Sequence, residues 1–253
     1  MKSNLRALCA AGAMFTRLPF WRLMRLDKED YQQALDWWPV VGLLTGSVVA
    51  WSFCFASKVF PISVAVILAI ASRLILTGGF HEDGLGDFFD GFGAGGSKER
   101  ILAIMKDSHV GSYAVLGYII YYGLLWQAYT HLAIDAEQLF GVMIYVDVVG
   151  KWVSSLQVQW LPYARDEETS KTGIIYLKAW GVPRFIGIAL VLLLPLVLGL
   201  ELVALGILDI ALLVGLGLMW YIKRKIGGYT GDTCGAISLL AELTAILATL
   251  ALI

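Results

Sequence analysis

The chain has 253 residues, a formal net charge of −1 and a mean hydropathy of +0.74; 58% of its residues are hydrophobic and 15% are charged. A soluble domain averages about 25% charged and 45–50% apolar residues, so these charges are too few to cover a soluble globule. The high hydrophobicity excludes a disordered chain. A nucleic-acid-binding protein needs a basic field, which a net charge of −1 does not provide. The composition therefore predicts a polytopic membrane protein.

The first 38 residues differ from the rest of the chain. Leu5, Leu8, Ala11 and Phe15 recur at helical spacing, and arginines lie nearby. A signal peptide is one interpretation, because a basic start precedes an apolar run, but the pattern of small residues at a cleavage site is weak. An N-terminal interfacial or partly inserted helix is the favoured interpretation.

Seven apolar stretches are candidates for helical membrane crossings, each of which needs about 20 residues. They are Val40–Ser57, Pro61–Thr77, Ser112–Ile134, Leu139–Leu161, Arg184–Leu200, Leu202–Ile222 and Thr233–Ile253. Their continuous apolarity favours helices over the alternating strands of a barrel. Because the chain has no clear repeat or linker, we expect a single domain over residues 1–253. The predicted fold is an all-α polytopic membrane bundle of about seven transmembrane helices plus the interfacial helix.

The basic residues predict an orientation. If the seven crossings alternate, 16 of the 19 lysines and arginines fall on the side of the N-terminus, and only Lys58 lies in a loop on the other side. Loops rich in lysine and arginine stay in the cytoplasm. The N-terminus is therefore expected inside the cell and the C-terminus outside.

The longest polar segment between spans runs from Thr77 to Gly91. Asp83, Asp87 and Asp90 stand at positions i, i+4 and i+7, so they share one face if the segment is helical. Three carboxylates repel one another strongly near a membrane, where the dielectric is low, and protons or a cation must offset the repulsion. Hard oxygen ligands suit Mg²⁺, Mn²⁺ or Ca²⁺, and Mg²⁺ needs only one or two carboxylates beside substrate phosphates. A solvated acidic loop or helix caps are the alternative interpretation.

Histidine and glycine accompany the aspartates. His81 is a candidate base or metal ligand, or simply a hydrogen-bonding residue. Eight glycines crowd nineteen residues, and they are Gly78, Gly79, Gly84, Gly86, Gly91, Gly93, Gly95 and Gly96. This density is typical of close backbone approach to a ligand, where exposed N–H groups can hold phosphate. Tight packing between helices is the alternative.

Three further polar groups lie on the same predicted side. Lys106 and Asp107 precede the third span, Arg165 follows the fourth, and Thr230 and Asp232 precede the seventh. Lys106 and Arg165 can bind phosphate oxygens or can simply serve the orientation. For Asp232, the two interpretations are a cap on the last helix and a place in the metal site.

Charged residues inside the predicted spans are costly unless they are paired. Asp147, Lys151 and Asp209 are of this kind, and Lys151 either pairs with Asp147 or reaches toward the cytoplasmic site. Arg73 lies about one turn from the end of its span, so its guanidinium is expected to snorkel to the membrane surface.

The string from Thr77 to Gly91 resembles the cobalamin synthase family, whose members are adenosylcobinamide-GDP ribazoletransferases. The resemblance covers most of the chain, because further motifs follow in the family's order. They are Thr16–Pro19, Pro39–Gly42, Ile104–Ser108 with Gly111, Tyr163–Arg165, and Thr230–Gly235 with Glu242. Three residues depart from the pattern. Glu82 and Gly86 replace an apolar residue and an alanine, and His109 stands where an arginine is expected.

The resemblance implies an enzyme that joins adenosylcobinamide-GDP to α-ribazole or α-ribazole 5′-phosphate, releases GMP and completes adenosylcobalamin or its 5′-phosphate. It further implies Mg²⁺ dependence and a site at the cytoplasmic face of a prokaryotic inner membrane. We hypothesise that Asp83, Asp87 and Asp90 hold Mg²⁺ against the diphosphate. His81 or one aspartate then orients or deprotonates the attacking ribose hydroxyl. The expected substrate-binding residues are Gly78, Gly79, Lys106, Asp107, Lys151, Arg165, Thr230 and Asp232.

Two other function classes stay open. The residues from Asp87 to Ala94 match the first half of the CDP-alcohol phosphotransferase signature, but Gly95 replaces the arginine that follows there. Intramembrane prenyltransferases also use aspartate motifs. A transporter is the other class, and it is motivated by Asp147, Lys151 and Asp209 within the predicted spans. Transporters bind substrate near the bilayer midplane, however, whereas the densest polar segment here lies between spans. The expected partners are the two substrates and the lipid bilayer, without nucleic acid, and a homo-oligomer stays open.

Overall fold

The structure is a computed structural model that describes residues 2–165, 176 and 181–252. Within this part of the chain the regular elements are helices, apart from one isolated bridge between Tyr163 and Tyr229. The predicted all-α fold class is therefore confirmed.

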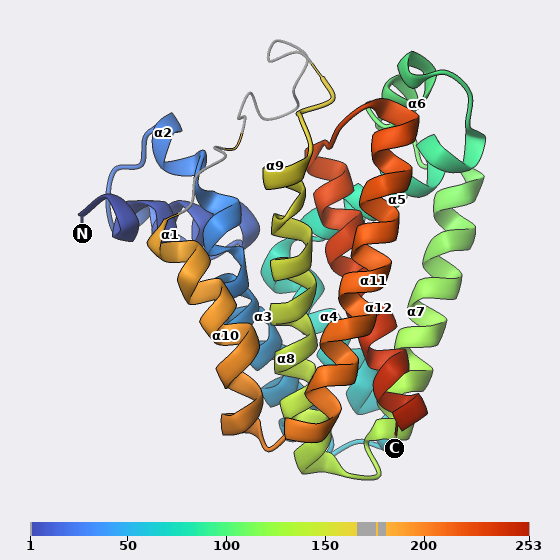
Figure 1. Cartoon of the computed structure of the whole chain (residues 1–253). Coiled ribbons are helices and arrows are strands. Elements are labelled where there is room, and N and C mark those ends of the chain that lie inside the picture. The colour runs from blue at the N-terminus through green and yellow to red at the C-terminus, as the bar shows by residue number, and fades with distance from the viewer. Residues whose placement is uncertain (1, 166–175, 177–180, 253) are drawn as a thin grey trace.

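The long helices run alongside one another as a bundle (Figure 1). The elements are α1 (Lys2–Phe15), η1 (Phe20–Arg22), α2 (Lys28–Tyr31), η2 (Ala34–Trp37), α3 (Trp38–Ala56), α4 (Ile62–Thr77), α5 (Phe80–Ala94), α6 (Lys98–Ile104), α7 (Ser112–Leu132), α8 (Ala136–Ser155), α9 (Gln157–Trp160), α10 (Val182–Leu198), α11 (Glu201–Ile226) and α12 (Gly231–Leu252).

Six of the seven predicted spans fall on one helix each, namely α3, α4, α7, α10, α11 or α12, and the fourth, Leu139–Leu161, covers α8 and the short α9. In the described residues, four helical stretches are long and apolar enough to cross a membrane alone. They are Ala34–Ala56, Ala136–Trp160, Val203–Ile226 and Gly231–Leu252. α4 and α5 qualify only as a bent pair, and α10 is a shorter apolar helix. The chain is thus a helical membrane protein, and seven crossings stay a prediction.

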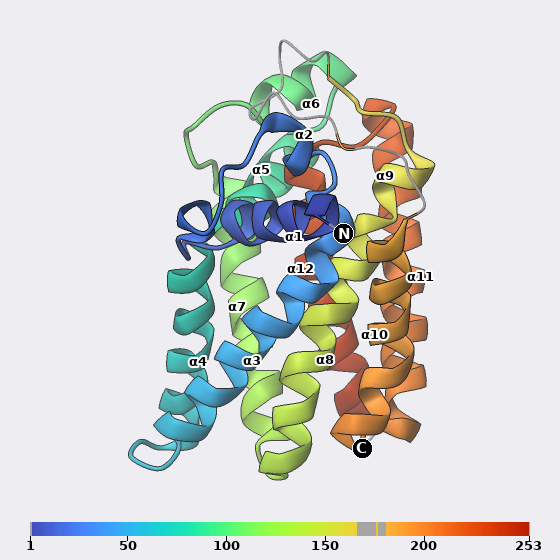
Figure 2. The same ribbon diagram turned by 90° about the vertical axis from the view of Figure 1, so that its left-hand side faces the viewer.

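α1 lies across one end of the bundle rather than along it (Figure 2). Ala7, Ala11 and Phe15 form its buried stripe at helical spacing, as an amphipathic helix requires. On its other side Arg6 pairs with Asp30 at 2.7 Å, and this guanidinium lowers the pKa of the Asp30 carboxyl. The predicted N-terminal helix is confirmed, and its place at a membrane surface stays a prediction.

α8 and α12 form the buried centre of the bundle. α3 packs against α8 through Gly42 and Gly46, which stand four residues apart on one face. A Cβ at Gly46 would lie 2.8 Å from the Ile144 Cα, so only glycine lets the two backbones approach this closely.

A sharp corner separates α4 from α5, whose axes differ by 95°. Gly78 and Gly79 form the corner with φ angles of 72° and 69°, a left-handed conformation that glycine adopts without strain. Beyond the corner, α5 packs closely on the first turn of α12. A Cβ at Gly84 would lie 2.8 Å from the Asp232 carbonyl oxygen, and one at Gly235 would lie 2.9 Å from the His81 carbonyl oxygen.

These contacts decide between the two interpretations of the glycine-rich segment for several of its members. Gly84 meets α12, while Gly86 and Gly93 lie against the side chains of Tyr118 and Tyr113 on α7. For these glycines, tight helix packing is confirmed. The packing brings the polar residues at the start of α5 and of α12 to one place.

We predict that Gly235→Ala forces α5 and α12 apart and lowers the free energy of unfolding by about 1–3 kcal/mol, as overpacked cores do. Thermal unfolding of the detergent-solubilised protein measures the loss. Gly123→Ala is the matched control, because a Cβ there meets nothing within 4 Å on α7. Equal melting temperatures for Gly235→Ala and the parent protein would contradict the close packing.

Candidate active site

The acidic segment forms a helix, as its spacing predicts, but its three aspartates have unlike surroundings. Asp83 is exposed, Asp87 is partly buried and Asp90 is buried. The Asp90 carboxylate accepts hydrogen bonds from the backbone N–H groups of Gly111, at 2.6 Å, and Ala114, at 2.9 Å. These groups belong to the start of α7, where a helix leaves its first N–H groups unpaired and favours negative charge. Asp90 therefore caps α7 from another helix.

Asp83 and Asp87 lie one helical turn apart and border a common hollow. We call it the acidic hollow; its lining includes Asp83, Asp87, Asp90, Lys106, Asp107 and His109. It brings Lys106 and Asp107 to the acidic helix, as the hypothesis of a shared site requires. Asp107 accepts a hydrogen bond from the exposed His109 ring at 2.6 Å, and this carboxylate raises the pKa of His109.

The carboxylates fit a magnesium ion that shares its shell with a substrate. Within the described residues, no group of three or more His, Cys, Asp or Glu side chains is placed to hold a metal ion. The Asp90 oxygens already accept two hydrogen bonds from the start of α7, and Asp83 and Asp87 are an adjacent pair of carboxylates one turn apart. Mg²⁺ in enzymes is commonly held by one or two carboxylates plus substrate phosphates. Magnesium binding by the three aspartates stays a prediction.

His81 is almost completely buried, with 2% of its surface exposed. Its Nε2 lies 3.1 Å from the Trp38 indole Nε1. Because an indole N–H only donates, Nε2 must accept, and a neutral ring then carries its proton on Nδ1. Nδ1 has no hydrogen-bond partner among the described residues. This arrangement makes His81 a hydrogen-bond donor and disfavours the predicted role of a base.

Arg165 and Asp232 come together at the start of α12, with 3.4 Å between the Arg165 Nη2 and the Asp232 Oδ2. A short backbone bridge between the segments of Tyr163 and Tyr229 aligns Arg165 with Asp232. In this bridge the Ala164 N–H donates to the Tyr229 carbonyl at 2.8 Å. Asp232 thus faces a cation, and the capping role belongs to a neighbouring threonine.

Thr230 and Thr233 cap α12 reciprocally. The Thr233 N–H donates to the Thr230 hydroxyl at 3.2 Å, and the Thr230 N–H donates to the Thr233 hydroxyl at 2.9 Å. Such a pair satisfies two otherwise unpaired backbone groups of a helix start. The Thr230 side chain is buried, and the hydrogen bonds give it a structural role beside its predicted part in substrate binding.

Two further hollows meet the acidic hollow at Asp83. The aromatic hollow lies between α1, α5 and α12, and its lining includes Phe15, Trp38, Phe80, His81, Asp83, Tyr163, Arg165 and Asp232. The corner hollow is lined by residues that include Arg17, Gly78, Gly79, Glu82, Asp83 and Tyr118. Asp83 borders all three hollows. Asp83 therefore lies where residues from separate predicted motifs come together.

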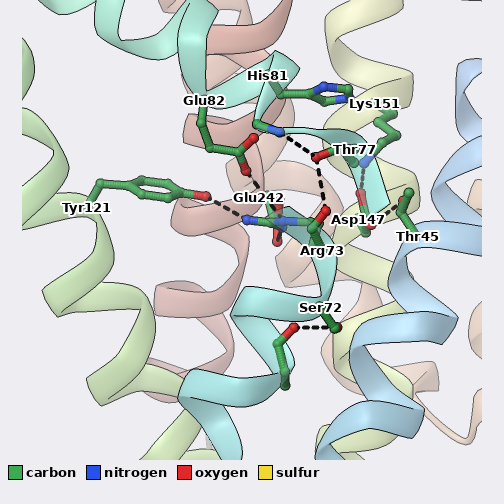
Figure 3. A network of polar contacts seen from close by, with 12 residues as sticks. Thr45, Ser72, Arg73, Thr77, His81, Glu82, Tyr121, Asp147, Lys151 and Glu242 are labelled. Carbon is green, nitrogen blue, oxygen red and sulfur yellow. Dashed lines mark hydrogen bonds and ion pairs between the residues drawn. The ribbon is translucent and has the colours of Figure 1, made fainter. Parts of the chain in front are cut away.

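Arg73 does not snorkel, so that prediction is wrong. Only 4% of its surface is exposed, and its Nη1 lies 2.5 Å from the Glu242 Oε1 (Figure 3). Its Nη2 donates to the Tyr121 hydroxyl at 3.2 Å, and its Nε lies 3.7 Å from the Glu82 Oε1. A guanidinium stays inside an apolar bundle when such partners are present.

Lys151 lies in the same buried network and pairs with Asp147, one of the two alternatives that its spacing allows (Figure 3). The Thr45 hydroxyl donates to the second oxygen of Asp147 at 2.6 Å. Lys151 is 1% exposed and is not among the residues that line the three hollows. A part in substrate binding stays a prediction for this residue.

Several residues at the site were not predicted to belong to it. Trp38, Phe15 and Tyr118 line the hollows, and Glu82 lies beside Arg73. Phe15 appeared only as part of the amphipathic stripe, and Glu82 only as a departure from the family pattern. For Trp38 a signal in the sequence was its position just before the Pro39–Gly42 motif.

The bundle and the polar residues at one of its ends define a membrane-embedded helical protein with a charged site. The model of the cobalamin-5-phosphate synthase family matches residues 7–250. An adenosylcobinamide-GDP ribazoletransferase of Shewanella oneidensis is 38% identical over 239 residues, which are 92% of this chain and 89% of that protein. A protein of the same name from Shewanella baltica is 39% identical over the same shares. No solved structure matches. The chain belongs to the cobalamin-5-phosphate synthase family.

We predict that Asp90→Asn destabilises the protein by about 1.5–3 kcal/mol, because the amide cannot accept both hydrogen bonds from α7. Thermal unfolding in detergent measures this loss. Asp135→Asn is the matched control: Asp135 caps α8 through one hydrogen bond, to the Gln138 N–H at 3.0 Å, and asparagine caps equally well. If both variants melt alike, Asp90 does not hold α7.

We predict that Arg73→Met lowers the free energy of unfolding by about 3–5 kcal/mol, since it leaves the Glu82 and Glu242 carboxylates buried without a cation. Adding Glu82→Leu to Arg73→Met restores part of the loss. Arg224→Met is the control, because Arg224 stacks on Trp220 at the exposed end of α11. An Arg73→Met protein as stable as its parent would show that the ion pair does not hold α4 to α12.

Proposed function

We propose that this protein is an adenosylcobinamide-GDP ribazoletransferase, which joins adenosylcobinamide-GDP to α-ribazole or α-ribazole 5′-phosphate and releases GMP. Residues from three family motifs line one hollow, and they are His81 and Asp83, Arg165, and Asp232. This meeting of separate motifs is the observation that carries the proposal. The match of the family model over residues 7–250 and the names of the relatives support it. The product is adenosylcobalamin or its 5′-phosphate.

The proposed reaction exchanges a phosphoanhydride bond for a phosphate ester bond. A ribose hydroxyl of α-ribazole attacks the phosphorus that carries the cobinamide, and a new P–O bond forms. The bond from this phosphorus to the bridging oxygen breaks, and GMP leaves with the electron pair. Asp83 is the proposed acceptor of the hydroxyl proton, because its exposed carboxylate borders both the aromatic and the acidic hollow.

Asp83 and Asp87 are the residues proposed to hold magnesium. The ion would neutralise charge on the diphosphate and on the leaving GMP. Lys106 in the acidic hollow and Arg165 in the aromatic hollow are proposed to bind phosphate oxygens, which pair well with ammonium and guanidinium groups. Asp90 contributes by fixing α5 against α7 rather than as a primary ligand.

The proposed location is the inner membrane of a prokaryotic cell, with the site on the cytoplasmic side. The orientation is supported by the basic residues, 16 of 19 of which fall on the side of the N-terminus when seven crossings alternate. The transporter alternative loses its main motive, because Asp147 and Lys151 neutralise each other inside the bundle.

We predict that purified protein with adenosylcobinamide-GDP, α-ribazole and Mg²⁺ releases GMP and forms a corrinoid product, and that chelation by EDTA stops both. Asp83→Asn and Asp87→Asn are expected to lower turnover by at least about a hundredfold, the scale of lost acid–base or metal catalysis, while melting normally. Asp135→Asn, on α8 and outside the three hollows, is the control that keeps full turnover.

Near-parental turnover in both Asp83→Asn and Asp87→Asn would refute the metal assignment. Incorporation of label into lipid instead of a corrinoid would favour a phosphotransferase or prenyltransferase and refute the proposed reaction.

A further inference from the structure

The aromatic hollow differs from the other two hollows in its walls. Phe15 and Trp38 stack with ring centroids 4.8 Å apart, and the His81 ring packs edge-on against both, at 5.8 Å and 5.1 Å. Phe80 also packs edge-on against His81, at 5.9 Å, and lies 6.2 Å from Phe15. The charged members of the lining include Asp83 and Arg165. Such walls suit a flat, largely apolar ring whose polar end reaches the charged residues.

His81 lines this hollow and carries one hydrogen-bond donor that no group of the described residues uses. Its Nε2 is occupied by the Trp38 indole N–H, so the proton of the neutral ring is on Nδ1. Nδ1 is buried and has no hydrogen-bond partner among the described residues. A buried donor without a partner costs free energy that a ligand with an acceptor at that point recovers.

We propose that the aromatic hollow takes the benzimidazole base of α-ribazole, and that the His81 Nδ1–H donates a hydrogen bond to the free imidazole nitrogen of that base. This inference rests on the proposed function. The base is flat and apolar, and its one unsubstituted ring nitrogen only accepts, which matches aromatic walls with a single donor. Guanine and adenine, the two bases of adenosylcobinamide-GDP, carry donors as well as acceptors along their edges and are matched less well.

The location of Asp83 supports the same arrangement. The ribose of a base held in the aromatic hollow extends toward Asp83, which borders this hollow and also the acidic hollow with Asp87 and Lys106. The attacking hydroxyl and the diphosphate then meet at the carboxylate proposed to accept the proton. His81 determines which base is accepted and takes no part in proton transfer.

The test compares α-ribazole with the indole riboside, in which a C–H group replaces the free imidazole nitrogen while shape and ribose stay the same. GMP release gives kcat and KM for each nucleoside. We expect the parent protein to prefer α-ribazole by about tenfold in kcat/KM, the scale of one buried hydrogen bond. His81→Phe brings this ratio to about one and leaves the KM for adenosylcobinamide-GDP unchanged.

Three further variants separate recognition from folding and from base catalysis. Trp38→Phe keeps an aromatic ring in the wall but removes the hydrogen bond that fixes the proton on Nδ1, so the preference for α-ribazole falls. Trp37→Phe is the matched control that keeps the preference, because the neighbouring Trp37 is buried but its indole nitrogen has no hydrogen-bond partner among the described residues. His81→Asn keeps an N–H donor near Nδ1, and we expect it to retain both the preference and the pH profile of kcat.

Equal kcat/KM values for the two nucleosides in the parent protein would overturn the inference, whether or not any variant folds. A preference that survives in a folded His81→Phe protein would overturn it as well, and so would loss of turnover with a changed pH profile in His81→Asn. The proposed function is judged separately: it fails if the parent protein releases no GMP with α-ribazole itself.

Discussion

The buried ion pair between Arg73 and Glu242 determines where the acidic helix lies. A guanidinium inside an apolar bundle has to keep its carboxylate, so the last turn of α4 is held against the middle of α12. The corner at Gly78 and Gly79 therefore begins at a defined point, and α5 leaves it in a defined direction. Two glycine contacts between α5 and α12 then set the distance at which their polar first turns face each other. Charge and small side chains together place the site.

The site itself is a meeting of segments that are far apart in the chain. Asp83 comes from α5, Lys106 from the segment before α7, and Arg165 from the segment after α9, where a short backbone bridge to Tyr229 aligns it with Asp232. The aromatic wall comes from α1 and the start of α3, together with Phe80 and His81 at the start of α5. The start of α5 therefore joins the aromatic part to the charged part. A reaction between two unlike substrates suits this arrangement, because groups from several segments are available to bind each of them.

The sequence predicted the helices and many residues of the site because both depend on local patterns. Apolar runs mark the bundle, and the i, i+4, i+7 spacing marks the acidic face of α5. Partners across the fold could not be predicted from those patterns. Glu242, which pairs with Arg73, lies 169 positions away, and the backbone groups capped by Asp90 lie 21 and 24 positions away. The tautomer of His81 depends on Trp38, 43 positions earlier. Asp83 and Asp90 have equivalent positions in the spacing pattern, so the sequence did not reveal that their roles differ.

α4 is short for a helix that ends in such a corner. Its 16 residues extend about 24 Å at the usual rise per residue, whereas the hydrocarbon core of a bilayer is about 30 Å thick. If α4 crosses the membrane, either the bilayer around it becomes thinner or the corner at Gly78 and Gly79 lies below the lipid headgroups. In both cases the depth of the acidic helix is coupled to bilayer thickness. The acyl-chain length of the surrounding lipids therefore affects the depth of the site, and with it the way in which a soluble and an amphipathic substrate reach this enzyme.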